Sequence, residues 1–302
     1  SPYLCPMTKT HRAGFISIIG KPNVGKSTLM NQLVGEKLSI ITSKAQTTRH
    51  RIMGIVNGEV DGDEFQLVYS DTPGIIKPMY ELHNSMMEYV HGSLKDADVV
   101  LFVTDIYEKY DEEDVIEKLG RSDAPLILII NKIDLATQEQ VEEKIEHWKK
   151  VLNPREILSI SALEGIGIEG LFQKIVKLLP VHPAYFPKDA LTDKPERFFA
   201  AEIVREKIFT NYKKEIPYSC EVVITEFKED DDIIRVYAEI YVERSSQRAI
   251  LLGHKGERIK KVGTEARLEM ETFFEKKIFL QQYIKVEADW RLKRDKIKSF
   301  GY

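Results

Sequence analysis

The segment Gly20-Lys21-Pro22-Asn23-Val24-Gly25-Lys26-Ser27 has the spacing Gly-x4-Gly-Lys-Ser and directly follows the apolar run 15–19. A strand, a glycine-rich turn and a helix start, in this order, form the setting that a phosphate-binding P-loop requires. The backbone N–H groups of such a turn point at a phosphate, and the helix N-terminus adds its positive dipole end. We expect nucleotide contacts from Gly20 to Thr28, with Lys26 on the β- and γ-phosphates and the Ser27 hydroxyl on Mg²⁺.

A second short motif, Asp71-Thr72-Pro73-Gly74, follows the run 65–70. An isolated Asp-x-x-Gly is usually a turn. Behind a P-loop and a strand, it is typical of a loop in which the Asp holds Mg²⁺ through water and the glycine amide senses a γ-phosphate. We therefore expect Asp71 to serve the metal and Gly74 to take part in catalysis beside Lys26.

The tetrapeptide Asn131-Lys132-Ile133-Asp134 follows the apolar run 126–130 and indicates which base is bound. The Asp134 carboxylate can accept hydrogen bonds from guanine N1–H and the 2-amino group, whereas adenine offers no such pair of donors. A site built this way rejects a ligand that leaves its buried polar group unpaired. We expect Asn131 to join this loop to the P-loop, the Lys132 stem to cover the base, and the amides of Ser161-Ala162-Leu163 to meet guanine O6.

The elements that must position these groups alternate along residues 13–180. Near-continuous apolar runs are typical of strands covered on both faces, and the stretches between them have helical patterns. This alternation predicts an α/β domain with a mostly parallel sheet, in which ligands bind at the carboxyl ends of the strands. The expected strands are 15–19, 51–56, 65–70, 99–105, 126–131 and 156–159, and the expected helices include 81–93, 112–119, 139–151 and 168–179.

Three prolines within eight residues, at 180, 183 and 187, predict a linker over 181–193, because neither a helix nor a central strand tolerates them. The remaining residues, 194–302, are expected to form a second domain. Its pattern reads helix, strand, strand, short helix, a Gly-x-x-Gly loop at 253–256, helix, strand and a terminal helix. This order matches a type II KH domain.

The Gly-x-x-Gly loop itself, Gly253-His254-Lys255-Gly256, is weak as a bare pattern, and its place between two helices gives it meaning. In KH folds this loop lets the backbone approach and clamp about four nucleotides of a single strand. Basic residues surround it, which is the charge pattern of a nucleic-acid groove. The expected RNA contacts are Arg244, Arg248, Ile250, Leu251, Gly253, His254, Lys255, Gly256, Arg258, Ile259, Lys260 and Lys261. The apolar residues Ile250, Leu251, Ile259 and Val262 could line the floor of the groove, although a place in the core is the stronger interpretation for them.

A second basic cluster closes the chain at Arg291, Lys293, Arg294, Lys296 and Lys298. Such a run is usually a solvated helix face. Contact with RNA phosphates is a second interpretation, and peripheral association with the inner face of the cell membrane is a third.

The chain has two cysteines and 43% hydrophobic residues, and its apolar runs of about five residues are far short of the ~20 that a membrane helix needs. No apolar region of a signal peptide is found near the N-terminus. These features predict a cytoplasmic protein.

The order of these motifs resembles that of the translation-factor-like GTPases and, within them, the Era family. The segment Lys44-Ala45-Gln46-Thr47-Thr48-Arg49-His50 also resembles the first switch of that family. The resemblance covers nearly the whole chain, because the Era pattern includes a C-terminal KH domain. It implies a six-stranded G domain whose second strand is antiparallel, and a Thr48 (or Thr47 in its place) that ligates Mg²⁺ and acts in catalysis with bound GTP. It further implies binding to the 3′ end of small-subunit (16S) ribosomal RNA in maturation of the small subunit, with no DNA partner.

Two details bear on the expected hydrolysis of GTP to GDP. In Ras-like enzymes a glutamine that orients the attacking water follows the glycine of Asp-x-x-Gly, whereas this chain has Ile75. We therefore expect slow basal hydrolysis that depends on Mg²⁺, Lys26 and backbone amides. Relatives with Asn at the position of Asn23 bind K⁺ beside the phosphates, so K⁺ is a further candidate cofactor.

Other functions remain open at this point. A GTP-regulated protein could bind another RNA, or an RNA-binding module could carry a weakly active nucleotide site. A metabolic P-loop kinase or ATPase would need a different base-reading loop and would be indifferent to replacement of Asp134 by Asn.

Overall fold

The computed structural model describes residues 10–108, 119, 123–152 and 154–302. Contacts between residues divide the chain into two compact units. The first unit contains the residues up to Ser39, His50–Ile75 and Glu88–Asp193; the second contains Ile40–Arg49, Ile76–Met87 and Lys194–Tyr302. This grouping departs from the predicted continuous domain of 13–180, because two segments inside that range make their contacts with the C-terminal part.

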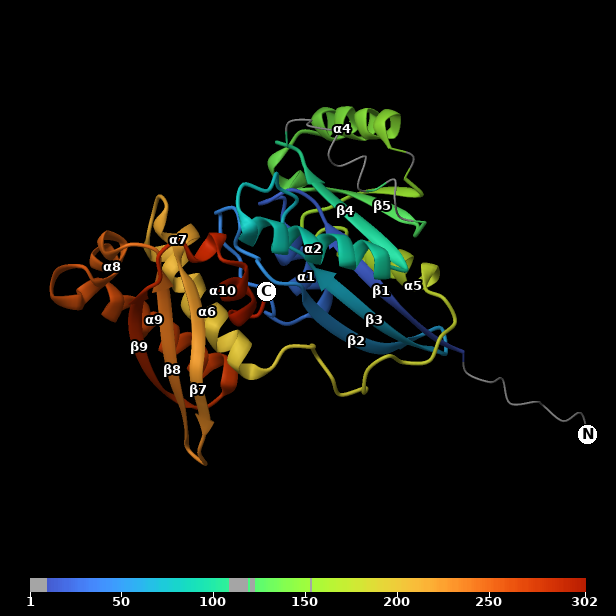
Figure 1. The fold of residues 1–302 in the computed structure, drawn as a ribbon. Helices are drawn as coiled ribbons and strands as arrows, with labels where there is room; N and C mark the ends of the chain where they lie inside the picture. Colours follow the sequence, from blue (N-terminus) through green and yellow to red (C-terminus); the bar gives the residue numbers. More distant parts are fainter. Residues whose placement is uncertain (1–9, 109–118, 120–122, 153) are drawn as a thin grey trace, which may run out of the picture. The chain divides into compact units, whose positions relative to one another are not determined.

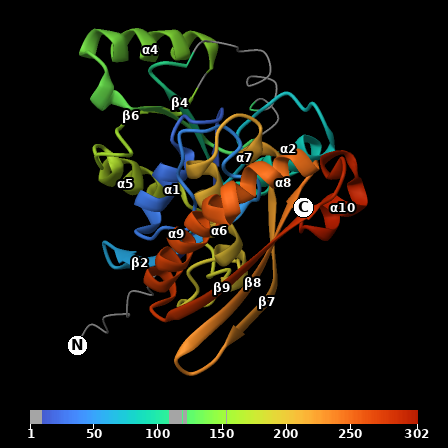
Figure 2. The ribbon, with the colours of Figure 1, turned by 90° about the vertical axis from the view of Figure 1, so that its left-hand side faces the viewer.

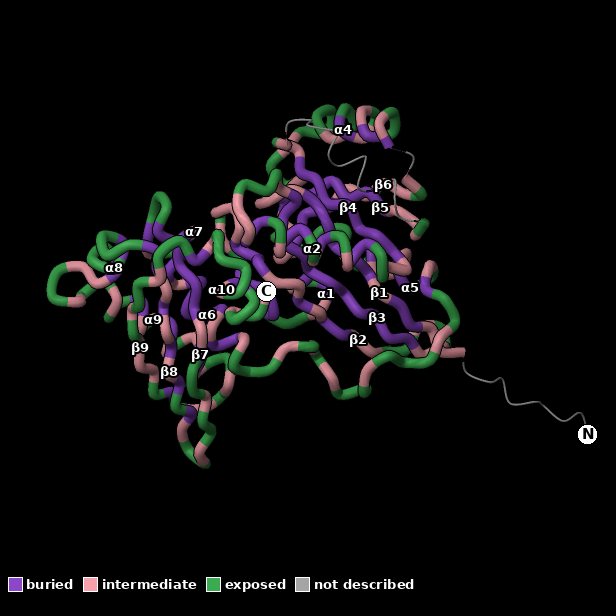
Figure 3. The backbone as a smooth tube through the Cα atoms, in the orientation of Figure 1, coloured by how far each residue is buried: buried purple, intermediate pink, exposed green. Residues whose placement is uncertain are grey.

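The first unit is built on a six-stranded sheet with the order β2-β3-β1-β4-β5-β6. All six predicted strands are present: β1 (His11–Ile19), β2 (Ile52–Val60), β3 (Asp63–Asp71), β4 (Val99–Asp105), β5 (Leu126–Asn131) and β6 (Glu156–Ser159). Only the β2–β3 pair is antiparallel. All seven residues of β4 are buried, because helices cover both faces of this part of the sheet. Figure 3 shows the same burial along the neighbouring central strands.

Four described helices flank this sheet: α1 (Lys26–Val34), α2 (Glu81–Asp96), α4 (Gln138–Val151) and α5 (Ile168–Leu178). Helices α1 and α5 contact each other on one face, and α2 crosses the opposite face (Figures 1 and 2). Helix α4 begins at a capping box, in which Thr137 Oγ1 accepts from the amide of Gln140 and the Gln140 side chain accepts from the amide of Thr137. The helix predicted at 112–119 lies outside the described residues, apart from Leu119.

The predicted linker 181–193 is packed along the first unit. Val181 and Thr192 form isolated β-bridges with Arg12 and Gly54. The fully buried Gln66 accepts hydrogen bonds from the amides of Tyr185 (2.7 Å) and Phe186 (2.9 Å). The prolines exclude a helix here, as the sequence indicates, but backbone and side-chain hydrogen bonds still fix the path of the segment.

The second unit contains a three-stranded sheet, β7 (Glu221–Glu229), β8 (Ile233–Val242) and β9 (Lys277–Val286), in that order. Strands β7 and β8 are antiparallel, and β8 and β9 are parallel. A parallel pair needs a crossover, which α8 (Ser245–Leu252) and α9 (Glu257–Phe274) supply. The remaining elements are α6 (Glu196–Asn211), α7 (Ile216–Ser219), the 3₁₀ turns η2 (His254–Gly256) and η3 (Trp290–Leu292), and α10 (Arg294–Ser299).

The core of the second unit lies between one face of this sheet and helices α6 and α9 (Figure 2). Burial alternates along β8, where Ile234, Val236, Ala238, Ile240 and Val242 are buried and the intervening residues are not. Trp290 is fully buried and donates from Nε1 to the carbonyl of Ser219 (3.0 Å), which fixes the C-terminal residues to the end of α7. In the part of the chain that the structure describes, no helix is both long and apolar enough to cross a membrane.

Candidate functional site

The P-loop connects the carboxyl end of β1 to α1. Gly25 has φ +98° immediately before the helix, and a Cβ there would lie 2.2 Å from Nδ2 of Asn131. Glycine is therefore required both for the backbone conformation and for the close approach of the next loop. Lys26 is 6% exposed and donates from Nζ to the carbonyls of Gly20 (3.1 Å) and Lys21 (2.8 Å). Burial lowers the pKa of Lys26 to about 8, although Asp71 and Glu108 act in the opposite direction.

Two oxygen groups meet beside this loop. The Ser27 hydroxyl donates to Oδ2 of Asp71 at 2.7 Å, and Asp71 is fully buried at the end of β3. Mg²⁺ prefers oxygen ligands and usually takes one or two from the protein, with water and phosphates completing the shell. The pair of Ser27 and Asp71 fits this requirement.

The loop that follows Asp71 lies directly on the P-loop. Thr72 donates from Oγ1 to the carbonyl of Ile18 (2.9 Å), and the amide of Ile75 donates to the carbonyl of Gly20 (3.0 Å). A Cβ at Gly74 would lie 2.6 Å from Pro22, so only glycine fits there. Ile75 is 6% exposed, and its buried apolar side chain has no group that could hydrogen-bond an attacking water.

Asn131 joins three loops at the carboxyl ends of the strands. Its Nδ2 donates to the carbonyl of Val24 (2.8 Å) and its Oδ1 accepts from the amide of Ala162 (2.9 Å). The next residue, Lys132, has φ +65° and donates from Nζ to the carbonyl of Asn23 (2.7 Å). Asp134 follows in the 3₁₀ turn η1 (Ile133–Leu135) with an exposed side chain, and Leu163 is 72% exposed beside the buried Ser161. P-loop, base-reading loop and the 161–163 turn are thus held together before any ligand binds.

The stretch after β4 was missed as a functional segment by reasoning from the sequence. Asp105 ends the strand, Lys21 forms an ion pair with Glu108 (3.2 Å), and Thr104 donates to Glu108 (2.6 Å). No short motif marks these residues. The available signal was their position, because they follow a buried strand at the same sheet edge as the recognised loops.

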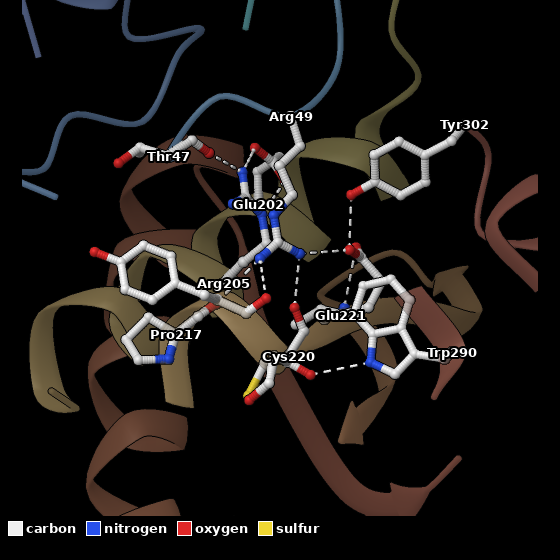
Figure 4. A network of polar contacts seen from close by, with 12 residues as sticks. Thr47, Arg49, Glu202, Arg205, Pro217, Cys220, Glu221, Trp290 and Tyr302 are labelled. Carbon is white, nitrogen blue, oxygen red and sulfur yellow. Dashed lines mark hydrogen bonds and ion pairs between the residues drawn. The ribbon is translucent and has the colours of Figure 1, made fainter. Parts of the chain in front are cut away.

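Thr48, the predicted Mg²⁺ ligand of the first switch, belongs by its contacts to the second unit, whereas Ser27 and Asp71 belong to the first. The ten residues Ile40–Arg49 are held there by three cations. Lys44 donates from Nζ to the carbonyls of Phe209 and Tyr212 at the C-terminal end of α6. Arg205 donates from Nη2 to the carbonyl of Thr47 (2.5 Å). Arg49 makes the third set of contacts, and Figure 4 shows the network around it.

The Arg49 side chain is fully buried at the C-terminal end of α7. Its Nη1 donates to the carbonyl of Cys220 (2.7 Å) and to Oε2 of Glu221 (2.9 Å), and its Nη2 donates to two further carbonyls, those of Pro217 and Tyr218. The hydroxyl of Tyr302 donates to the same Oε2 at 2.7 Å (Figure 4). Cations at a helix C-terminus are stabilised by its exposed carbonyls. Arg49 and the chain end therefore share one buried carboxylate.

Like Ile40–Arg49, the segment Ile76–Met87 belongs to the second unit. It contacts residues 291–294. Arg291 lies over the ring of Tyr80, with its guanidinium carbon 4.8 Å from the ring centroid, and Arg294 lies 3.8 Å from Glu81. Burial, with the charges of Arg49 and Arg291, lowers the pKa of His83 to about 4. His83 is therefore neutral at neutral pH and adds no further charge to this basic region.

The Gly-x-x-Gly loop forms the sharp turn between α8 and α9. Gly253, Lys255 and Gly256 have φ values of +69°, +48° and +77°. His254 and Lys255 project as exposed residues, and Arg244, Arg248, Arg258 and Lys260 are exposed around them. Lys261 is paired loosely with Glu265 at 3.7 Å. For the other cations no carboxylate partner occurs among the described residues.

The described structure corrects one predicted RNA contact. Leu251 is fully buried in the core of the second unit, so its side chain cannot reach a ligand. Ile259 is partly buried against the same core, whereas Ile250 is 40% exposed and remains available. Adjacent helix positions point in different directions, so Leu251 lies on the inner face of α8 and Ile250 on its outer face. The eight residues of this helix are too few for the sequence pattern to show which face is buried.

Comparisons with known proteins agree with this geometry. A family model described as a 50S ribosome-binding GTPase matches residues 15–132, and a KH domain model matches residues 215–291. GTPase Era of Geotalea uraniireducens is 43% identical over 297 residues, covering 97% of this chain and 99% of that protein. The chloroplastic GTPase ERA1 of Zea mays is 45% identical over 301 residues, covering 97% and 71%. The chain belongs to the Era family of GTPases.

Solved Era structures have the same fold. The crystal structure of a single-residue variant of Aquifex aeolicus Era bound to GDP and AlF4⁻ has a TM-score of 0.91 and 40% identity, covering 96% of this chain and 99% of that one. Era in complex with MgGDPNP and nucleotides 1506–1542 of 16S ribosomal RNA has a TM-score of 0.91 and 39% identity, covering 97% and 99%. The predicted fold class, a P-loop GTPase domain followed by a KH domain, and the predicted GTPase activity are confirmed.

The pKa of Lys26 generates a testable prediction. In the predicted role of Lys26, its protonated form binds phosphate. The pKa of Lys26 would then rise on binding, and nucleotide affinity would fall once the pH exceeds the pKa of Lys26 in the free protein. We expect the Kd for GDP to be flat below about pH 7.5 and to rise by up to about tenfold per pH unit above pH 8. Calorimetric titrations from pH 7 to 9.5 measure this.

The variant Lys26→Arg is the control for this experiment, because its guanidinium stays charged throughout. Its absolute affinity is expected to be lower, but any slope that remains reports other groups, including the ionisation of guanine N1–H. A wild-type profile that is no steeper than that of Lys26→Arg would contradict the assignment.

Proposed function

We propose that this Era family member is a GTP-controlled switch that binds single-stranded RNA, namely the 3′ end of 16S ribosomal RNA, during maturation of the small ribosomal subunit. The observation that carries the RNA half is the Gly-x-x-Gly turn with exposed, unneutralised cations around it. A neighbour of the same fold contains nucleotides 1506–1542 of 16S ribosomal RNA, which supports this choice of target. Glycines permit close approach of the backbone, and Arg244, Arg248 and Lys255 would neutralise phosphates.

For the nucleotide half, we propose the following roles. Lys26 and the P-loop amides hold the β- and γ-phosphates, Ser27 binds Mg²⁺ directly, and Asp71 binds it through water. Asp134 reads guanine, with Asn131 as the tie between the loops. With Ile75 in place of a glutamine, charge on the γ-phosphate must be stabilised by Lys26, Mg²⁺ and the Gly74 amide. Hydrolysis is accordingly expected to be slow.

The coupling between the two halves follows from the segment Ile40–Arg49. With GTP, Thr48 would ligate Mg²⁺; in the structure, Lys44 and Arg49 bind the same ten residues to helix ends of the second unit. One short segment therefore carries both a proposed metal ligand and the anchors for the RNA-binding unit. A nucleotide that binds more tightly when this segment has one of two arrangements increases the population of that arrangement at the expense of the other.

The C-terminal basic cluster is a weaker candidate for a membrane or RNA surface. Arg291 pairs with Glu243, Lys293 and Lys296 pair with Glu287, and Arg294 lies near Glu81. Three carboxylates thus face four of the five cations, which reduces their attraction for phosphate. We propose a structural role for this cluster and no dependence on membranes.

Binding of RNA nucleotides 1506–1542 by a double variant tests the RNA half. Arg248→Ala with Lys255→Ala removes two phosphate contacts, so the slope of log K against log salt should become shallower by about 1.4, and affinity near 0.1 M salt should fall by roughly tenfold or more. Fluorescence anisotropy at four salt concentrations measures both quantities.

The matched control is the double variant Lys228→Ala with Lys277→Ala. It removes two exposed lysines that lie outside the Gly-x-x-Gly loop, one near the end of β7 and one at the start of β9. It should leave affinity and slope close to wild type. Equal losses in the two double variants would contradict a site at the Gly-x-x-Gly loop. Crosslinking to total RNA, followed by sequencing, decides between this target and another RNA.

Potassium is proposed as the second cation of the nucleotide site. Asn23 has φ +66°, and its carbonyl accepts from Lys132, so the P-loop backbone is fixed at the position where the resemblance implies a K⁺ ion. We expect GTP hydrolysis to be at least several-fold faster in K⁺ than in Na⁺ buffer of equal ionic strength. Equal rates would exclude the proposal, and Asn23→Ala should remove the difference between the two ions.

A further inference from the structure

The short stretch Asp105–Glu108 after β4 lies outside every recognised motif, yet it touches the base-reading loop. Asp105 is 6% exposed and uses both carboxylate oxygens. Oδ1 accepts from the amides of Tyr107 (2.9 Å) and Glu108 (2.8 Å), which folds the turn. Oδ2 accepts from Nζ of Lys132 at 2.5 Å.

Lys132 is consequently fixed at its ammonium end. It donates to Asp105 and to the carbonyl of Asn23, while its own backbone is in the left-handed region at φ +65°. The four-carbon stem is held between these fixed points, and it is the part of Lys132 that would cover the base. Without the Asp105 carboxylate, the Lys132 ammonium would keep only the carbonyl of Asn23 as a partner. The Lys132 side chain, which is 30% exposed, could then rotate towards the solvent.

A second contact from the same stretch holds the turn beyond Lys132. The hydroxyl of Tyr107 donates to the carbonyl of Leu135 at 3.1 Å. Leu135 directly follows Asp134 in η1. Lys132 and Leu135 therefore flank Asp134, and each is bound to a residue of the Asp105–Glu108 stretch.

We propose that Asp105 and Tyr107 are positioning residues for guanine specificity. They brace the Lys132–Leu135 turn from both sides, which sets the Asp134 carboxylate where N1–H and the 2-amino group of guanine both reach it. This inference rests on the proposed role of Asp134. Neither residue contacts the nucleotide; both act through the turn that carries the reading group.

A braced turn has a measurable consequence for hypoxanthine nucleotides, which keep N1–H but lack the 2-amino group. When IDP binds, one oxygen of the held Asp134 carboxylate lacks the hydrogen bond that the 2-amino group of guanine would donate, and this loss is a penalty relative to GDP. When the turn is loose, the carboxylate can move into water and the penalty shrinks. Loss of the brace should therefore weaken GDP binding more than IDP binding.

Two variants separate the two contacts. In Asp105→Asn the side-chain oxygen can still accept from the amides of Tyr107 and Glu108, but the new amide group cannot accept from the Lys132 ammonium. Tyr107→Phe removes only the hydroxyl. We expect the Kd for GDP to rise about tenfold in the first and about threefold in the second, with the GDP-to-IDP preference falling several-fold in the first. Titration calorimetry with both diphosphates measures this.

A double-mutant cycle tests the path of the effect. In a Lys132→Met background, Asp105→Asn should cause little further change in the Kd for GDP, because its partner is gone. Asp63→Asn is the control: this carboxylate accepts from the amide of Thr10 (3.1 Å) at the opposite end of β3, so neither nucleotide should bind differently.

The outcomes are distinguishable. Two results would contradict the proposal and indicate a general structural role. One is an equal loss of affinity for GDP and IDP in both Asp105→Asn and Tyr107→Phe. The other is an undiminished effect of Asp105→Asn on the Kd for GDP in the Lys132→Met background. Asp134→Asn tests the base site on its own, since an amide suits the 2-carbonyl of xanthine: the proposed role of Asp134 requires a shift from GDP to XDP. If that shift occurs and the GDP-to-IDP preference of the brace variants stays at the wild-type value, only the brace fails.

Discussion

The buried guanidinium of Arg49 is the interaction on which the arrangement of the switch segment depends. It binds the backbone carbonyls that end α7 and the carboxylate of Glu221, and Tyr302 completes the coordination of that carboxylate. Removing one partner of such a buried pair typically costs about 3–5 kcal/mol, because the remaining charge is left uncompensated. In the role proposed for Thr48, a nucleotide that draws this residue towards Mg²⁺ would act on a segment whose next residue, Arg49, is strongly held.

The nucleotide site has a different logic, since it is built in advance at one sheet edge. Parallel strands bring the ends of β1, β3 and β5 together, and Asn131 connects the resulting loops through two buried hydrogen bonds. The Asp105–Glu108 stretch adds a further support from the end of β4. The residues proposed to bind phosphate and to read the base thus share one hydrogen-bonded frame, and the part expected to move is the segment Ile40–Arg49, which lies between β1 and β3 in sequence.

Much of this could be predicted from the sequence, and the exceptions have physical causes. P-loop, Asp71 and Asn131 are recognisable because their chemistry demands particular residues at fixed short spacings, and all six strands followed from apolar runs. Leu251 was misplaced because one helical position separates the core face from the exposed face. The contacts of Arg49 with Glu221 and of Asp105 with Lys132 could not be predicted, because they join residues that are 172 and 27 positions apart. No local pattern encodes such pairs.

We propose that nucleotide state and RNA binding are linked through the segment that Arg49 anchors. The most direct test is the affinity for RNA nucleotides 1506–1542 measured with GDP and with a non-hydrolysable GTP analogue, in the wild type and in Arg49→Lys. Lysine keeps the charge but loses the planar fork that spans several carbonyls. We expect the RNA affinity to differ about 5- to 150-fold between the two nucleotide states in the wild type, and the difference to be smaller in Arg49→Lys. Equal RNA affinity in both nucleotide states of the wild type would contradict it.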